Sequence, residues 1–317
     1  MYIFHDHLDG GIRPHSLLEM AIDAKYQDIM HLNDEEVALL LDKSNSKSLE
    51  DFLGAFVHTI AMMQNFENIE RIAFEAAEDM HNEGIKYYES RFAPLYSVNK
   101  ALNLKDVINA IHSGFKEAER KYSIKSGVIV CGMRNDPNSV KLLANEVINN
   151  ISDSIIGFDI AGPELGYPPS MYKDEFIKLK DKGINLTIHA GEGAGVDYIE
   201  DAIECGADRI GHGVRIIEDI DTAGRNISLG KVSQRVLERQ ILLEICISSN
   251  IHTKMYKSID EHPITILNDI GFNISINTDN RLMSNTSISK ELEIAKSLGI
   301  ENVENLLKYS ASDSFFD

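Results

Sequence analysis

Residues 185–190 read Asn-Leu-Thr-Ile-His-Ala, a short run of strand-forming residues that follows Gly183 and contains a histidine near its end. Runs of this kind recur along the chain, and several are introduced by a Gly that could end a preceding helix. Polar and apolar residues at helical spacing fill the segments between them, such as Tyr172–Lys182, Tyr198–Cys205 and Ser228–Arg239. Strands that alternate with helices are typical of a parallel α/β fold. The runs predict eight strands, which suggest closure into a (β/α)8 TIM barrel: Tyr2–His7, Ile85–Phe92, Gly127–Gly132, Ile155–Ala161, Asn185–Ala190, Asp208–Gly213, Ile241–Cys246 and Phe272–Asn277.

The polar residues of these runs lie mainly toward their C-terminal ends. A barrel places its chemistry there, because the loops after the strands form the mouth while packed side chains fill the lower part. An open, doubly wound sheet is the structural alternative. Its usual phosphate-binding signals are G-x-G-x-x-G after the first strand or G-x-x-x-x-G-K-[ST], and the chain has neither. We therefore expect no nucleotide cofactor.

A long insertion, roughly Gly11 to Glu83, separates the first two strands and exceeds what one connecting helix needs. We expect several helices in it, within a single barrel domain that covers residues 1–317. Ser48-Leu49-Glu50-Asp51 has the pattern of a capping box, followed by an apolar stripe at helical spacing, Leu49, Phe52, Leu53 and Phe56. Such a helix either packs on the barrel or, because of its position after the first strand, covers the mouth as a lid.

The composition excludes several classes of function. The 317 residues are 43% hydrophobic and 26% charged, which allows a large core. The 31 Lys and Arg against 50 Asp and Glu give a net charge of −19, so we expect neither a nucleic-acid partner nor a membrane partner. Without a long apolar run or a secretory signal, the sequence predicts a cytoplasmic protein. The three cysteines lack C-x-x-C spacing, so no disulfide framework or thiolate zinc site is expected.

Four candidate metal ligands lie at the ends of predicted strands. His5 and His7 close the first run and, because side chains alternate along a strand, share the face that points into the barrel. His189 lies at the end of the fifth run and Asp279 follows the eighth. A lone histidine is more often a hydrogen-bonded core residue, but four such groups at matching strand ends favour a metal site. Imidazoles with a carboxylate suit Zn²⁺ with a position left for water, although Fe²⁺, Co²⁺ or Mn²⁺ could substitute.

Glu192 and His212 should face the same mouth. A carboxyl group in a dry pocket can stay protonated and act as a general acid, and a histidine near a metal-bound water can steer or deprotonate it. The alternative for Glu192 is a solvated loop carboxylate, and the alternative for His212 is a strand-end residue hydrogen-bonded to the backbone. Adjacent glycines favour function for both residues, because they allow a substrate to approach the chain closely.

Other polar positions remain open at this level. Ser248-Ser249-Asn250 could contact a ligand or form a turn, and Asp159 and Glu164 could serve strand-end packing or binding. The remaining histidines lack companions in the sequence, and we interpret them as surface or packing residues: His15, His31, His58, His81, His112, His252 and His262.

The motifs together resemble the adenosine deaminase family of the amidohydrolase superfamily, and bacterial members in particular. The resemblance rests on His-Asp-His-Leu-Asp-Gly, Ala-Gly-Pro-Glu, Thr-Ile-His-Ala-Gly-Glu, Arg-Ile-Gly-His-Gly and Asn-Thr-Asp-Asn-Arg-Leu-Met-Ser, in the family's order, from about Phe4 to Leu298. It implies hydrolytic deamination of adenosine to inosine and ammonia, with one Zn²⁺ on His5, His7, His189 and Asp279. The zinc would lower the pKa of its bound water toward about 7.

The resemblance also implies a role for each remaining residue. Glu192 would give a proton to purine N1, and His212 and Asp279 would orient and deprotonate the attacking water. The implied substrate-binding positions are His7, Asp9 at a ribose hydroxyl, Gly162 at N3, Asn280 at N7, and the stripe Leu49, Phe52, Leu53 and Phe56 as a hydrophobic gate. The chain departs from the family at Asn280 and Pro163, where relatives have Asp, and in a shorter C-terminal end after Ser312.

Adenine or an AMP-type nucleotide is the alternative substrate. Asp9 favours the nucleoside, because a short carboxylate suits a ribose hydroxyl and repels a phosphate. Nucleobase editing by the other type of zinc deaminase is disfavoured, since H-x-E with P-C-x-x-C is absent. A non-catalytic nucleoside-binding barrel is the alternative from another class, and no sequence feature specifies an oligomeric state.

Overall fold

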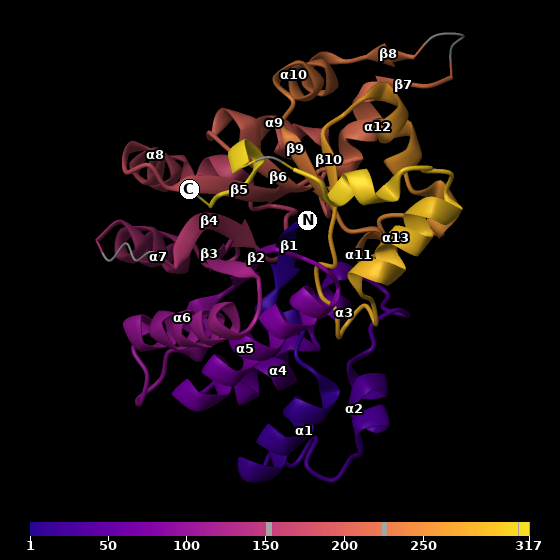
Figure 1. The fold of residues 1–317 in the computed structure, drawn as a ribbon. Coiled ribbons are helices and arrows are strands. Elements are labelled where there is room, and N and C mark those ends of the chain that lie inside the picture. The colour runs from indigo at the N-terminus through magenta and orange to yellow at the C-terminus, as the bar shows by residue number, and fades with distance from the viewer. Residues whose placement is uncertain (150–153, 224–226, 310, 317) are drawn as a thin grey trace.

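The computed structural model describes residues 1–149, 154–223, 227–309 and 311–316 and forms a (β/α)8 barrel, as the sequence predicts (Figure 1). Eight parallel strands form the sheet in the order β1-β2-β3-β4-β5-β6-β9-β10. Their bounds match the predicted runs to within one or two residues: β1 Tyr2–His7, β2 Tyr87–Phe92, β3 Lys125–Met133, β4 Ile155–Ala161, β5 Asn185–Ala190, β6 Arg209–His212, β9 Leu242–Ile245 and β10 Ile274–Ile276.

The barrel closes between its last strand and its first through the segment that follows β10. The amide of His7 donates to the carbonyl of Asp279 over 2.6 Å, and the amide of Asp279 donates to the carbonyl of His5 over 3.0 Å. Asn277 adds its side chain, whose Oδ1 accepts from the amides of Phe4 and His5. Closure therefore sets Asp279 directly beside the two histidines of β1.

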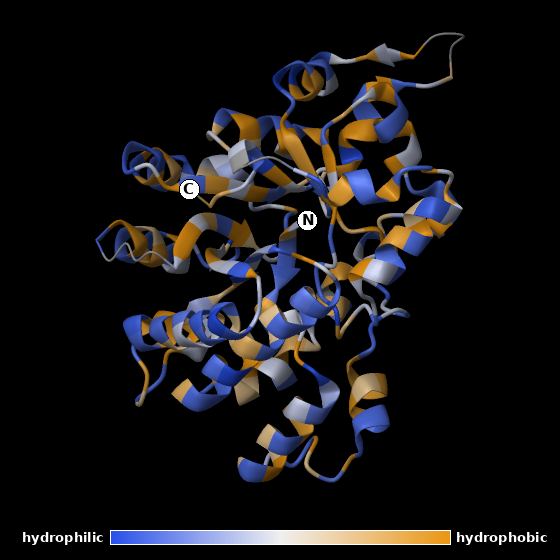
Figure 2. Ribbon diagram, viewed as in Figure 1, coloured by the Kyte–Doolittle hydropathy of each residue, from blue (hydrophilic) through white to orange (hydrophobic). Residues whose placement is uncertain are grey.

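Helices after the strands cover the outside of the barrel (Figure 1). Figure 2 shows mixed hydrophobic and hydrophilic residues along these helices, as expected for elements with one face on the barrel. Their bounds are α6 Leu104–Lys121, α7 Pro137–Asn149, α8 Lys173–Asp181, α9 Val196–Glu204, α10 Lys231–Arg239, α12 Ile264–Ile270 and α13 Ile288–Ser297. The short helix α11, Ile247–His252, lies instead at the mouth, where its residues contact Asp279 and His212.

One predicted helix is too long at its start. Ser228–Leu229 forms the short strand β8, antiparallel to β7 (Ile220–Asp221), and α10 begins only at Lys231. The cap of α10 comes from a distant residue: the carboxylate of Asp219 accepts from the amides of Val232 and Ser233 over 2.8 and 2.7 Å. A cap supplied across a hairpin leaves no signal at the start of the helix itself.

The insertion between β1 and β2 contains five helices, α1 Pro14–Asp23, α2 Asp34–Leu41, α3 Leu49–Leu53, α4 Phe56–Met62 and α5 Phe66–Asn82. The predicted capping box is half formed: Ser48 Oγ accepts from the amide of Asp51, but the Asp51 carboxylate accepts from Lys47. The apolar stripe is also not one helix, because α3 ends at Leu53 and α4 begins at Phe56. Its residues nevertheless face one cavity, described below.

The three cysteines, Cys131, Cys205 and Cys246, are buried and unbonded, as the sequence predicts. Within the described ranges, no helix is both long and apolar enough to cross a membrane. Residue 317, in the C-terminal segment noted above, lies outside the described residues.

Candidate metal and active site

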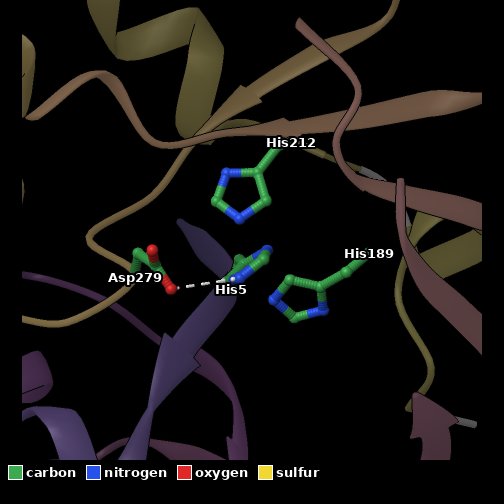
Figure 3. Close-up of side chains that lie close together, drawn as sticks. All are labelled: His5, His189, His212 and Asp279. Carbon is green, nitrogen blue, oxygen red and sulfur yellow. Dashed lines mark ion pairs between the residues drawn. The ribbon is translucent and has the colours of Figure 1, made fainter. Parts of the chain in front are cut away.

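Imidazoles and a carboxylate from four strand ends converge at the mouth of the barrel. Figure 3 shows His5, His189, His212 and Asp279 pointing toward one another, and their ligand atoms all lie within 4.8 Å of each other. His7 joins the same group, since its Nε2 lies 3.3 Å from Nε2 of His189 and 3.4 Å from Oδ1 of Asp279. The structure thus brings together all four predicted ligands, with His212 beside them.

The donor set fits a tetrahedral metal ion. Atoms about 2.0–2.1 Å from such an ion lie about 3.3–3.4 Å from one another. Nε2 of His5 lies 3.3 Å from Oδ1 of Asp279, and the two distances from His7 Nε2 given above have the same size. Nε2 of His5 is also buried without a hydrogen-bond partner, a costly arrangement that an ion would relieve. These side chains could therefore hold a divalent cation.

Buried carboxylates orient two of the imidazoles from behind. Nδ1 of His189 lies 2.7 Å from Oδ2 of Asp159, and Nδ1 of His5 lies 3.1 Å from Oε2 of Glu244. A carboxylate at Nδ1 holds the proton there and leaves Nε2 with the lone pair that a metal needs. Arg91 pairs with both carboxylates over 2.7 Å and keeps them ionised inside the barrel.

The electrostatics of the cluster suit cation binding. Burial lowers the pKa of His5 and of His7, which favours their neutral, metal-binding form. Burial also lowers the pKa of His189, but the neighbouring Asp159 outweighs it, so that the net pKa is raised and the imidazole is more basic. Burial raises the pKa of Asp279, yet the close approach and charge of His5, with the charges of the other histidines, bring it well below its usual value. Asp279 is therefore an anion at neutral pH.

Glu192 lies on the other side of the cluster, where its Oε2 is 3.6 Å from Nε2 of His212. Burial raises the pKa of Glu192 although His212 opposes the rise, so the carboxyl group can hold a proton as a general acid requires. Glu164 anchors the loop that carries Glu192: its carboxylate accepts from the amides of Glu192 and Ala194. Of the two roles left open for Glu164, strand-end packing and binding, these contacts are of the packing kind.

Two of the site residues have unusual backbone conformations. His212 has φ = 60° and Asp279 has φ = 55°, in the left-handed region that side chains other than glycine rarely adopt. Strain of this kind clusters at functional sites, where the surrounding structure enforces it. His212 is the last residue of β6 and Asp279 lies three residues after the end of β10, and each turns its side chain back into the mouth.

A small cavity of about 40 Å³ lies at the cluster, and the apolar stripe lines it. A second cavity, of about 540 Å³, adjoins it and shares five lining residues: His7, Leu53, Phe56, Ala161 and Gly162. Two polar atoms in these walls are buried without partners: Oδ1 of Asp9 and Oδ1 of Asn280. Gly162, with φ = +94°, exposes its backbone between the cavities. The predicted substrate-binding positions thus line these two adjoining cavities.

Sequence reasoning missed several groups behind the site. Glu244 lies in β9 and Arg91 in β2, and the sequence pattern of these strands does not indicate a function for either residue. Ser249 was also missed as a contact of the site, since it donates to Oδ2 of Asp279 over 2.5 Å. His262, interpreted above as lacking companions, lies within 3.2 Å of Asn250, which in turn contacts His212. The polar triplet Ser248–Asn250 was the one local signal for this part of the site.

Comparison with known proteins agrees with the geometry. A family model described as adenosine deaminase matches residues 2–317. The chain is 41% identical over 300 residues to adenosine deaminase 1 of Streptomyces coelicolor, covering 92% of this chain and 75% of the relative. Among solved structures, an adenine deaminase from Arthrobacter aurescens superposes with a TM-score of 0.82 at 20% identity, over 98% of this chain and 89% of that one. An amidohydrolase from Burkholderia ambifaria with bound Zn gives 0.83 at 20% identity, over 98% and 86%.

Proposed function

The chain belongs to the adenosine deaminase family, and on that basis we propose that it converts adenosine to inosine and ammonia by zinc-dependent hydrolysis. The observation that carries the proposal is the convergence of His5, His7, His189 and Asp279 with Glu192 and His212 beside one small cavity. Six chemically suited groups from distant parts of the chain are hard to explain as packing alone.

His5, His7, His189 and Asp279 would hold the ion. Their distances and the unpartnered Nε2 of His5 support this set. The imidazole and carboxylate donors favour zinc over harder cations. When bound, zinc supplies a water molecule acidified from a pKa of about 15.7 to about 7, able to attack purine C6 at neutral pH.

His212 and Asp279 flank the position of the attacking water. Ser249 occupies Oδ2 of Asp279, which leaves Oδ1 facing the histidines and the reaction site. His212 approaches from the opposite strand end, β6. Between them these two residues orient the water and take its proton.

Attack at C6 places negative charge on the purine ring, and Glu192 is positioned to relieve it by protonating N1. Its raised pKa, caused by burial, favours the protonated form that this step requires. We assign the backbone N–H of Gly162 to N3 and the amide of Asn280 to N7. The apolar wall formed by Leu49, Phe52, Leu53 and Phe56 would exclude bulk water during the reaction.

The outer cavity supports a nucleoside as substrate. None of its lining residues is Lys or Arg, and Asp9 contributes a carboxylate with one unpartnered oxygen. A hydroxyl group of ribose would satisfy that oxygen, whereas the phosphate of AMP would find no cationic side chain in these walls. Adenine alone would leave the cavity of about 540 Å³ unfilled.

Steady-state kinetics on adenosine, 2′-deoxyadenosine, adenine and AMP, followed by ultraviolet absorbance, test the proposal. We expect turnover of both nucleosides, little turnover of adenine or AMP, loss of activity with a chelator and recovery with zinc. Faster turnover of adenine or AMP would overturn the substrate assignment. Binding of adenosine without turnover by the zinc-loaded protein would instead identify a non-catalytic binding barrel.

A further inference from the structure

Three buried side chains, His212, Asn250 and His262, form a hydrogen-bonded chain that leads away from the metal cluster. Their exposed fractions are 1%, 0% and 5%. Asn250 lies in α11, and His262 lies in the segment just before α12. Polar groups buried this deeply take their hydrogen bonds from one another, so the direction of each bond constrains the next.

The hydrogen bond at His262, the residue of this network farthest along from the metal cluster, fixes the direction of the other bonds. The backbone amide of Ile264 donates to Nδ1 of His262 over 3.2 Å. An amide is always a donor, so Nδ1 of His262 carries no proton. Burial, reinforced by the nearby His212, lowers the pKa of His262 to about 3, which keeps the ring neutral. The single ring proton therefore lies on Nε2.

The hydrogen bonds of Asn250 determine which nitrogen of His212 accepts. Nε2 of His262 donates to Oδ1 of Asn250 over 3.2 Å, and Nδ2 of Asn250 lies 3.1 Å from Nδ1 of His212. The orientation of an asparagine amide is usually ambiguous, but here the donor on His262 decides it. Because Nδ2 is a donor, Nδ1 of His212 must accept, and a proton at Nδ1 would face another donor.

We propose that His262, acting through Asn250, is a positioning residue that holds His212 as the neutral Nε2–H tautomer, so that His212 offers a hydrogen-bond donor to the reaction site. The catalytic consequence, though not the tautomer, rests on the proposed deamination. His212 then orients the attacking water by donating to its oxygen. It has no lone pair at Nε2 with which to take a proton, so Asp279 is left as the acceptor of the two.

The tautomer can be observed without any activity. In zinc-loaded protein labelled with ¹⁵N-histidine, two-bond ¹H–¹⁵N correlations distinguish a ring protonated at Nε2 from one protonated at Nδ1, and loss of signals in His212→Gln assigns the ring. We expect the Nε2–H pattern for His212. A proton on Nδ1 of His212 in the unmodified protein would overturn the proposal. An Nε2–H pattern in a protein that does not deaminate adenosine would leave the tautomer assignment standing and remove only the proposed function.

Substitutions then test the catalytic consequence. Asn250→Asp places an acceptor against Nδ1 and should move the proton there, with kcat reduced about 10²-fold or more and a smaller change in KM, as for other histidines forced into the wrong tautomer. Asn268→Asp, on the exposed side of α12, controls for the added charge. His262→Gln can still accept from Ile264 and donate to Asn250, so it should keep the Nε2–H pattern and a higher kcat than His262→Leu. Unchanged kcat in a folded Asn250→Asp variant whose tautomer has reversed would refute the role of His212 as a donor.

Discussion

Asp159→Asn is the change that most directly tests how the metal site is built. Both oxygens of Asp159 receive donors. Oδ2 lies 2.7 Å from Nδ1 of His189 and 2.7 Å from Nη1 of Arg91, and Oδ1 accepts from the amide of His189 over 3.1 Å. An asparagine in either orientation would turn its NH₂ group toward at least one of these donors. His189 would lose part of what fixes its ring and raises its basicity.

The expected loss follows from the position of Asp159 behind a ligand. Removing such a partner typically lowers metal affinity about 10- to 100-fold, equivalent to about 1.4–2.8 kcal/mol. The fold should survive, because Arg91 retains its ion pair with Glu244 over 2.7 Å. We therefore expect weaker zinc binding by a protein that still folds, and a loss of activity that added zinc partly restores.

Competition with a chromophoric chelator measures the zinc affinity directly. Asp174→Asn, on the exposed first turn of α8, removes the same charge away from the site and should leave the affinity unchanged. If folded Asp159→Asn bound zinc within about twofold of the unsubstituted protein, well short of the typical effect, the assignment of His189 as a ligand oriented by Asp159 would be wrong.

Three further changes test other parts of the site. Glu192→Gln should retain zinc and nucleoside but lose about 10²- to 10⁴-fold in kcat, because it cannot protonate N1; near-normal turnover would exclude Glu192 as the acid. Phe56→Ala should lower kcat/KM for adenosine about 5- to 30-fold by opening the wall shared by the two cavities, whereas Leu142→Ala on α7, at a side chain 48% exposed, should have little effect; equal effects would argue against a gate. Burial raises the pKa of Glu244, but Arg91 and Arg209 bring it well below the usual 4.5, so that on acidification the unfolded chain takes up this proton first. The contribution of Glu244 to stability is therefore complete above pH 4.5 and decreases as the pH falls toward the lower pKa of the folded state. Denaturant titrations of the metal-free protein would detect this as a falling free energy of unfolding. A free energy of unfolding that did not change with pH would contradict the lowered pKa of Glu244.

Local sequence pattern was sufficient for the barrel strands and the proposed ligand set. The period of two along a strand places His5 and His7 on one face, and the end of β5 marks His189 in the same way. These signals survive in the sequence because each depends on neighbouring residues alone. The apolar stripe was also detectable; its division into α3 and α4 was missed, although Gly54, directly after α3, is a residue that commonly ends a helix.

The groups behind the ligands required the folded structure. Glu244 meets His5 across 239 positions, and Asn250 meets His212 across 38, so neither contact has a local pattern. The sequence alone determined which side chains lie at strand ends, because the alternation of side chains along a strand and the alternation of strands with helices both depend on residues near one another in the sequence. Only the tertiary structure decided which buried acceptors and donors face each imidazole, because those partners meet only after the barrel closes and water is excluded.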